Sequence, residues 1–562
     1  MTTHSRLLLL CVLIPTWLFA APTGPVDAPE VYTLDRNVAD RQIATFEDVG
    51  TYCALPDSRD KPENRRKSHE LVWHRGALYA GMVGWVQPVC DAPGVSFANY
   101  PEVYGSGLFV AATAGVFRLA DDQTPARLAA SVSAAPTPTA DTAARVRLTT
   151  FMRDAGWCWY QDPRVILHQG KLFIGAVKGN GDGEALVGIY DLRAEKSLGP
   201  FVLHEKFDCD DHNSPVFYAR PDGSVLAMYA RHSREKFHYY RVSDPQDCTR
   251  WSEEKRIDHT ATLPERDRVT YMNLLPLSAE GKLYNFYRGF EFNPSFVTST
   301  DDGLTWSEDT HFIKSEVPGY QRPYARYAGN GRDTVLVTFT DAHPRDFGNS
   351  IYYTAFRGRA FYRADGTKIS DLADGPLKPS AAERIFRGSG VKTDGATLGN
   401  APSAAWTSSI ALDTQGRPHI AYTLYLSNDD HRYRLASWDG KKWIDREIAY
   451  GGRCLYAKEA SYTGLVTLDP VDPTQVFIST NVNPSTGIDS GGRHEIYRAK
   501  IGPHDNLQTV KWEPVTHDSS VANLRPIIVR DGAQRVVLWT RGVFRSYADY
   551  NLEAVGFVET AD

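Results

Sequence analysis

The stretch NSPVFYARPDGSVLAMYARHS, residues 213–233, decides the fold of this 562-residue chain. It contains two runs of apolar and aromatic residues, and Pro221, Asp222 and Gly223 separate them. Aromatic and β-branched residues favour strands, whereas Pro, Asp and Gly favour tight turns. The stretch therefore predicts a β-hairpin.

The same hairpin pattern occurs seven times along the chain. The other six copies begin at Asp162, Tyr271, Arg322, Ser403, Tyr462 and Leu524. Successive copies start 51 to 81 residues apart, which leaves room for about four short strands and their loops. We therefore predict an all-β fold, a seven-bladed β-propeller. A pair of β-sandwiches is the alternative that hairpin spacing alone does not exclude.

The segment STDDGLTW, residues 299–306, fits the Asp-box pattern, which is a structural motif of propellers. We expect Asp301 to bond the backbone of the turn and Gly303 to adopt a conformation that other residues avoid. Trp306 is expected to pack beneath the turn. The motif supports the fold and says little about chemistry.

The beginning of the chain differs from the repeats. Residues 1–21 combine a basic residue, an apolar run and small residues, which predicts a cleaved secretory signal peptide. No segment approaches the roughly 20 apolar residues of a membrane-spanning helix. We therefore expect a secreted or periplasmic monomer without a membrane span. Residues 22–150 are expected to add strands or a cap to a propeller at residues 151–562.

Composition limits the partners of the protein. The net charge of −6 argues against a nucleic-acid partner, and the 29 Tyr and 12 Trp are typical of surfaces that face carbohydrate. Export also permits disulfides. Proximity in sequence suggests the pairs Cys53–Cys90 and Cys209–Cys248.

Candidate catalytic residues lie where the predicted strands begin and end. His212 precedes the first strand of the second repeat, and His232 follows its second strand. Because the strands of a hairpin are antiparallel, these two ends lie on the same face. Tyr271 and Arg288 have the same relation in the third repeat. Neighbouring propeller repeats converge on one central cavity, so we expect all four side chains to border one pocket.

This set of side chains suits β-elimination from a uronic acid in a polysaccharide. The guanidinium of Arg288 can neutralise the carboxylate, an imidazole can remove the C5 proton, and a phenol can protonate the departing oxygen. No cofactor is needed for this chemistry. Taken singly, a histidine or tyrosine at a strand end is more often a structural turn residue, and Arg288 could equally be a surface ion-pair partner. The joint placement on two adjacent blades favours function. Asp210 and Asp211 are expected to orient His212 or to cap the turn.

Several runs resemble the BNR-4 repeat family, and within it the ulvan lyases of polysaccharide lyase families 24 and 25. They are DAGWCWYQDPRVI (154–166), FDCDDHNSPVFYARPDGSVLAMYARHS (207–233), YNFYRGF (284–290) and the Asp box. The resemblance covers roughly residue 154 to the C-terminus. It implies cleavage between rhamnose 3-sulfate and a uronic acid, which leaves an unsaturated uronate.

The resemblance also implies roles for individual residues. His212 would be the base, Tyr271 the acid and Arg288 the carboxylate neutraliser, with His232 as a second pocket histidine. The base and acid roles of His212 and Tyr271 can be exchanged. The expected substrate contacts are Arg322, Tyr324 and Asn293.

A structural zinc is a further implication of the resemblance. Its expected ligands are His343, His431, Cys454 and His494. His419 is a rival ligand, and a disulfide with Cys158 would remove Cys454 from the set. Calcium is possible at the acidic turns around Asp182 and Asp469.

Two other functions fit the same repeats. A sialidase-like glycoside hydrolase would need an arginine triad and, for most hydrolytic mechanisms, paired carboxylates. A carbohydrate-binding propeller without activity would need no acid and base together. Unsaturated ends released from an anionic polysaccharide would distinguish a lyase from both.

Overall fold

The computed structural model describes residues 147–179, 181–319, 323–392 and 403–560, together with the backbone of six strands among the first 146 residues. The chain divides into two units, Met1–Arg145 and Val146–Asp562. The predicted signal peptide and the pair Cys53–Cys90 lie outside the described residues. Among the residues described, no helix is long and apolar enough to cross a membrane.

The described strands of the first unit form one four-stranded antiparallel sheet and one two-stranded sheet. The larger sheet has the order β2 (Ser68–His74), β3 (Ala77–Met82), β4 (Trp85–Pro88) and β5 (Ala98–Asn99). The smaller sheet pairs β1 (Glu30–Thr33) with β6 (Gly115–Arg118).

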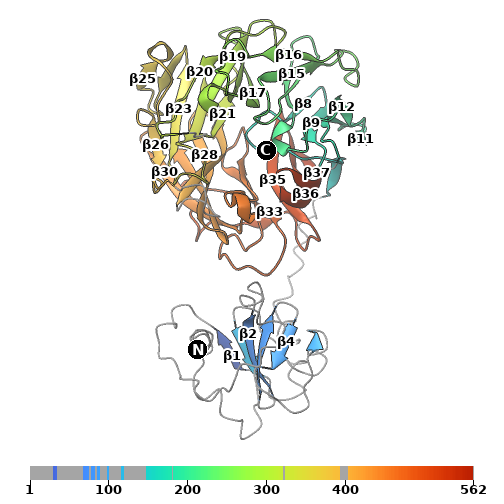
Figure 1. The fold of residues 1–562 in the computed structure, drawn as a ribbon, viewed down its shortest axis with the longest axis vertical. Helices are drawn as coiled ribbons and strands as arrows, with labels where there is room; N and C mark the ends of the chain where they lie inside the picture. The colour runs from blue at the N-terminus through green and yellow to red at the C-terminus, as the bar shows by residue number, and fades with distance from the viewer. Residues whose placement is uncertain are drawn as a thin grey trace. The chain divides into compact units, whose positions relative to one another are not determined.

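The second unit consists of seven antiparallel sheets that follow one another around a ring in chain order (Figure 1). Blade 1 contains β8 (Val165–His168), β9 (Lys171–Val177), β10 (Ala185–Asp191), β11 (Lys196–Ser197) and β12 (Phe201–His204). Blade 2 contains β13 (Val216–Ala219), β14 (Val225–Tyr229), β15 (Phe237–Val242) and β16 (Lys255–Asp258). Blade 3 contains β17 (Thr270–Leu277), β18 (Lys282–Arg288), β19 (Pro294–Ser299) and β20 (Thr310–His311).

Blade 4 is the largest sheet. It contains β21 (Ala325–Gly329), β22 (Val335–Thr340), β23 (Ile351–Arg357), β24 (Ala360–Tyr362), β25 (Lys368–Asp371) and β26 (Glu383–Phe386). Blade 5 contains β27 (Ala404–Leu412), β28 (Pro418–Ser427), β29 (Asp430–Trp438) and β30 (Trp443–Gly452). Blade 6 contains β31 (Val466–Leu468), β32 (Gln475–Thr480), β33 (Glu495–Lys500) and β34 (Glu513–Pro514). The longest interval between predicted repeats, from Arg322 to Ser403, is explained by the two additional strands of blade 4.

Blade 7 joins the two ends of the propeller. Three strands come from the end of the chain, β35 (Ala522–Asp531), β36 (Gln534–Ser546) and β37 (Asp549–Thr560). The fourth is β7 (Thr149–Met152), which precedes blade 1 and pairs with β37. The predicted propeller start at residue 151 therefore falls inside a strand that closes the ring.

The prediction of an all-β, seven-bladed propeller is confirmed. Each predicted hairpin forms the first two strands of a blade, as in blade 2, where Val216 pairs with Met228 and Ala219 with Val225. All five residues of β14 are buried, because a blade packs against a neighbour on both faces. The apolar cluster between blades 4 and 5, for example, joins Leu336 to Ile420.

The Asp box forms the turn expected from the sequence. Oδ1 of Asp301 accepts hydrogen bonds from the backbone N–H groups of Leu304 and Thr305. Gly303 has a φ of 90°, and the indole of Trp306 donates to its carbonyl oxygen at 3.2 Å. The motif ties the end of β19 to the blade 2 side of the core, where Trp306 packs.

The predicted disulfide between Cys209 and Cys248 is wrong, because both thiols are free. Sγ of Cys209 donates to the carbonyl oxygen of Gly179 at 3.0 Å. Cys248 instead lines a rim cavity beside Gly223, in the turn between β13 and β14. The two cysteines are close in sequence but lie at opposite ends of the strands of blade 2. Cys158 and Cys454 are free as well.

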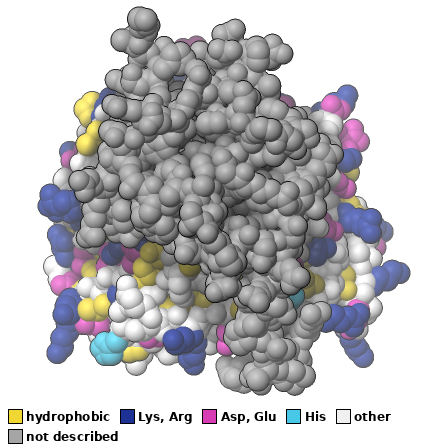
Figure 2. Space-filling view, turned by 90° about the horizontal axis from the view of Figure 1, so that it is seen from below, with side chains coloured by type: hydrophobic (Ala, Val, Ile, Leu, Met, Phe, Trp, Pro, Cys, Tyr) yellow, Lys and Arg dark blue, Asp and Glu magenta, His cyan; other side chains and the backbone are white. Residues whose placement is uncertain are grey.

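The outer surface carries both signs of charge. Figure 2 shows Lys and Arg side chains standing out around the visible perimeter, with Asp and Glu among them. Exposed charges of opposite sign also pair in the propeller, as Arg250 does with Asp244 at 2.7 Å. This mixture agrees with the small net charge of the chain, −6.

Candidate functional site

The centre of the propeller is filled by aromatic side chains. The segment after β7 places Trp159 and Tyr160 on the axis, where they are 1% and 2% exposed. The indole of Trp159 and the phenol of Tyr160 both donate to the carbonyl oxygen of Thr407 in blade 5, at 3.1 and 2.9 Å. Trp406 and Tyr462 pack against Trp159, with ring centroids 4.9 and 5.3 Å away. Several blades therefore meet on one short segment.

Two histidines lie together at one end of blade 2, as the sequence predicted. Their rings stack with centroids 4.2 Å apart. Asp210 joins them, because Oδ1 lies 2.6 Å from Nδ1 of His212 and Oδ2 lies 2.9 Å from Nδ1 of His232. Asp210 also accepts from the backbone N–H of His212, so the carboxylate caps the short 3-10 helix η5 (Asp211–Asn213). The expected orienting role of Asp210 therefore has a geometric basis.

The two histidines differ in their surroundings. The side chain of His212 is 3% exposed, and its Nε2 lies 3.1 Å from the hydroxyl of Tyr462. The side chain of His232 is 19% exposed, and within the described part of the chain its Nε2 has no hydrogen-bond partner. Both ring nitrogens of His212 are engaged, whereas one nitrogen of His232 is available to a ligand.

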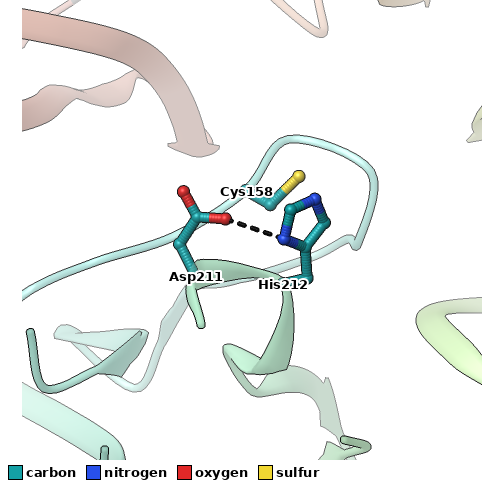
Figure 3. Close-up of side chains that lie close together, drawn as sticks. All are labelled: Cys158, Asp211 and His212. Atoms are coloured by element: carbon teal, nitrogen blue, oxygen red, sulfur yellow. Dashed lines mark ion pairs between the residues drawn. The ribbon is translucent and has the colours of Figure 1, made fainter. Parts of the chain in front are cut away.

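Asp211 belongs to a second group of side chains beneath His212. Figure 3 shows the thiol of Cys158 and the carboxylate of Asp211 pointing toward the imidazole of His212. Oδ1 of Asp211 lies 3.1 Å from Nδ1 of His212, and Oδ2 lies 2.5 Å from the guanidinium of Arg525 in β35. Arg525 and Asp211 are both fully buried, and Arg525 also donates to the carbonyl oxygen of Trp157. This ion pair links blade 7 to the loop that carries His212.

Tyr271 and Arg288 border a pocket in the adjacent blade. The guanidinium carbon of Arg288 lies 4.8 Å from the ring centre of Tyr271 and 4.7 Å from that of Tyr324. The hydroxyl of Tyr271 accepts from Arg288 at 3.4 Å. The pocket has a free volume of about 250 Å³, including the part open to solvent, and is also lined by Tyr160 and Tyr287. The expected proximity of Tyr271 and Arg288 is confirmed, and Tyr324 joins them. His212 and His232 do not line this pocket, in contrast to the expectation, but lie beside Tyr271, with ring centroids 5.8 and 6.5 Å from its ring.

Burial and charge set the protonation of these groups. Burial, outweighing the nearby carboxylate of Asp210, lowers the pKa of His232 to about 4. Burial also opposes the charged form of His212, but Cys158 and other acidic neighbours, Asp210 included, outweigh it and raise the pKa of His212 well above its ordinary value. Burial, followed by the effect of Tyr324, raises the pKa of Tyr271 well above its ordinary value, against the opposing effect of Arg288. At neutral pH the site therefore combines the neutral imidazole of His232, the imidazolium of His212 and the protonated phenol of Tyr271.

Two of the expected substrate contacts are not placed in this pocket. Arg322 lies outside the described residues. Asn293 is 3% exposed, and its amide bonds the carbonyl oxygens of Phe290 and Glu291 and the backbone N–H of Ser315. Asn293 therefore holds the loop after β18, while its neighbour Pro294 lines the pocket.

The metal predictions have different geometric support. Among the described residues, two groups bring three possible ligand atoms within 4.8 Å of one another, and both include His212. No three of the predicted zinc ligands, within those residues, come as close. His431 and His494 are nonetheless buried, and burial, followed for His494 by Arg453, lowers their pKa values to about 4 and about 3. Neutral imidazoles suit zinc. The zinc site with His343 and Cys454 stays a prediction.

The structure argues against the rival zinc ligand His419 and against a calcium ion at Asp469. His419 pairs with Ser437 at one end of the β28–β29 hairpin, and His431 pairs with Tyr425 at the other end. The two histidines therefore do not share a site. Asp469 is fully buried and binds the guanidinium groups of Arg530 and Arg535, at 2.5 and 3.2 Å. These two arginines already neutralise the carboxylate that a calcium ion would need.

Sequence reasoning missed Tyr462 and Arg525, although a signal for both was present. Tyr462 begins the sixth repeat and Arg525 is the second residue of the seventh. His212 and Tyr271 were chosen because they lie at the start of a repeat, and Tyr462 and Arg525 lie at the start of later repeats in the same way. The rule that repeat starts converge on the axis predicts all four when it is applied to every blade.

The ring of seven antiparallel sheets around a centre packed with aromatic side chains defines the protein as a seven-bladed β-propeller. The sequence model of the BNR repeat-containing family matches residues 158–450, and the chain belongs to this family. No curated protein sequence matches the chain significantly.

Solved structures resemble the chain at low sequence identity. A PL25 ulvan lyase, described as a new family of polysaccharide lyase and bound to -[GlcA(1-4)Rha3S]-, is 15% identical with a TM-score of 0.51, covering 73% of this chain and 95% of the lyase chain. A second structure described as PL25 ulvan lyase gives 16% identity, the same TM-score of 0.51 and the same coverage of 73% and 95%. The polysaccharide lyase Uly1 is 12% identical with a TM-score of 0.45, covering 76% and 95% of the two chains.

Proposed function

We propose that the protein is a polysaccharide lyase that cleaves a uronate-containing, sulfated polysaccharide by β-elimination. The observation that carries the proposal is the position of Arg288, which lies over Tyr271 and Tyr324 in the blade next to the histidine pair. A guanidinium, a neutral imidazole and a protonated phenol are the three groups that this elimination requires. The solved PL25 ulvan lyases with the same fold add support for the substrate class.

In the proposed reaction, Arg288 binds the C6 carboxylate and reduces its negative charge, which makes the C5 proton acidic. A histidine takes this proton, and the electrons of the C5–H bond form a C4–C5 double bond. The C4–O4 bond breaks, and the phenol of Tyr271 donates its proton to O4. The products are a new hydroxyl end and an unsaturated uronate.

His232 is the better proton acceptor of the two histidines. The resemblance to ulvan lyases implied His212 as the base, with the role exchangeable with that of Tyr271. Asp210 accepts from Nδ1–H of His232, which leaves the lone pair on Nε2 directed away from the carboxylate. The raised pKa of His212 keeps this residue charged, and its two ring nitrogens already have partners. His212 would then provide a positive charge beside the reacting carboxylate.

The contacts of the carboxylates disfavour a glycoside hydrolase. Hydrolysis by the usual mechanisms needs two carboxyl groups on either side of the scissile bond. Asp210 is engaged by two histidines, and Asp211 by His212 and Arg525. Neither is directed at the pocket beside Arg288. A propeller that only binds carbohydrate is the remaining alternative, and turnover separates it from a lyase.

The test is incubation with ulvan, followed by the ultraviolet absorbance of unsaturated uronate and by an assay for reducing ends. The wild-type protein should produce both signals. Arg288→Ala should lower kcat/KM by about 10³-fold, the effect of losing one oriented charge stabiliser. Arg250→Ala, at an exposed arginine on the outer edge of blade 2, is the matched control and should retain full activity. Reducing ends without the chromophore would establish hydrolysis instead, and binding without either signal would establish a carbohydrate-binding protein.

A further inference from the structure

A chain of buried polar side chains leads from the interface of blades 2 and 3 to the backbone of Tyr271. It begins at Asp309 between β19 and β20, continues through His259 after β16 and ends at His238 in β15. His238 is 0% exposed and His259 is 1% exposed, and the side chain of Asp309 is 3% exposed. The elimination proposed above gives none of these three residues a role.

Each link in this chain is a hydrogen bond of 2.6 to 3.1 Å. Nε2 of His238 lies 3.1 Å from the carbonyl oxygen of Tyr271, and Nδ1 lies 2.8 Å from Nε2 of His259. Nδ1 of His259 lies 2.6 Å from Oδ1 of Asp309. The hydroxyl groups of Tyr287 and Thr262 also donate to Asp309. Tyr287 lines the pocket as well, so the chain reaches the pocket in two places.

The acceptor at the end of the chain fixes where its protons lie. A carbonyl oxygen only accepts, so His238 carries a hydrogen on Nε2. Burial, followed by the effect of His259, lowers the pKa of His238 well below its ordinary value, which keeps the ring neutral. Nδ1 of His238 is therefore an acceptor, and Nε2 of His259 must donate to it. One proton then lies between His259 and Asp309, and every link has one donor and one acceptor.

The residue at the end of the chain has an unusual backbone. Tyr271 has a φ of 67°, in the left-handed region that residues with a side chain rarely adopt. The pairing of β17 with β18 shifts register between Thr270 and Asn273, so Tyr271 lies in a bulge. Such conformations persist where surrounding contacts hold them, and they cluster at functional sites. An ordinary strand residue at this position would direct its side chain elsewhere.

We propose that His238, His259 and Asp309 form a positioning device that holds the backbone of Tyr271 in this conformation and so directs its phenol into the pocket. The device is anchored in blade 2 through the histidines and in blade 3 through Asp309. It therefore also fixes the position of blade 2, which carries His232, relative to blade 3, which carries Tyr271 and Arg288. Its effect on turnover rests on the proposed lyase function, whereas its effect on the backbone of Tyr271 does not.

Two substitutions at one position test the link to Tyr271. His238→Leu removes the donor to the carbonyl oxygen, whereas His238→Gln offers an amide N–H in its place. The leucine variant should lose about 10²-fold in kcat with KM nearly unchanged, the effect of misplacing a catalytic group by about 1 Å. The glutamine variant should recover most of the loss. His204→Leu is the matched control. His204 does not line the pocket, and its Nδ1 lies 2.7 Å from the carboxylate of Glu254. This variant should keep the wild-type kcat.

A second substitution tests the chain without changing the residue that bonds Tyr271. His259→Leu should lower kcat as much as His238→Leu, and the double variant should show no further loss, because both changes break the same chain. Losses that multiply in the double variant, or a glutamine variant as inactive as the leucine variant, would overturn the proposal.

Crystal structures of the His238 variants provide a test that does not depend on activity. Tyr271 should leave the left-handed region in His238→Leu and keep it in His238→Gln. If wild-type protein does not act on ulvan, the proposed function fails while this test still applies. A leucine variant whose Tyr271 keeps its conformation would overturn the positioning role, whatever the reaction. The His259→Leu crystal structure gives the same test if His238→Leu does not fold.

Discussion

The buried ion pair between Asp211 and Arg525 allows a quantitative test of how the centre of the propeller is held together. Both side chains are 0% exposed, and 2.5 Å separates the guanidinium from Oδ2. Arg525→Met keeps an unbranched side chain of similar length, which retains packing against Phe544 and Trp159. The change leaves the carboxylate of Asp211 buried without its guanidinium partner, and the imidazole of His212, at 3.1 Å, is already bonded to Asp210 at 2.6 Å. Removing one partner of a buried pair costs about 3–5 kcal/mol.

The assay is unfolding in urea, followed by tryptophan fluorescence, for wild type, Arg525→Met, Asp211→Asn and the double variant. The free energy of unfolding should fall by about 3–5 kcal/mol in the arginine variant and by clearly less in the double variant, in which no unpaired charge is buried. Arg250→Met is the control, since Arg250 is 70% exposed in its ion pair with Asp244, and its midpoint should not change. A loss below about 1 kcal/mol for Arg525→Met, or additive losses in the double variant, would refute the reasoning.

Three further predictions concern chemistry. Tyr271→Phe should lower kcat/KM on ulvan by about 10²–10⁴-fold, because it removes the proton donor without changing the ring, and near-normal rates would exclude the phenol as the acid. Because the pKa of His232 is lowered to about 4, the base is neutral above that pH, so kcat/KM should rise as pH increases through about 4 and then level off. A rise centred near pH 6.5, the value of an unperturbed imidazole, would contradict this environment for His232. Alkylation of the unfolded protein without reductant, read by mass spectrometry, should label both Cys209 and Cys248, and a peptide linking them would restore the predicted disulfide.

Much of the candidate site was predictable because it follows from local geometry. His212 and His232 flank one hairpin, and Tyr271 and Arg288 lie at the ends of the next. Antiparallel strands bring such ends together whatever the rest of the fold does. The same local information predicted the Asp box. It did not predict the bulge at Tyr271, because the register shift depends on contacts that β17 makes with its neighbours.

Other errors arose where closeness in sequence stood in for closeness in space. Cys209 and Cys248 belong to one blade, yet the strands between them place the thiols at opposite ends of it. Asn293 lies beside a pocket residue, but its amide is used within its own loop. Neither outcome could be read from residue type, because each depends on the direction in which the backbone turns after a strand.

The sequence by itself determined seven hairpins, their conversion into blades, and the end of each blade on which polar residues gather. These properties depend on alternation, turn residues and strand direction, all of which act over short distances along the chain. Only the tertiary structure decided which repeats meet across the axis. Tyr462 contacts His212 and Arg525 contacts Asp211 in a ring that the pairing of β7 with β37 closes. Ring closure fixes the rotation of every blade about the axis, and contacts between distant repeats depend on that rotation.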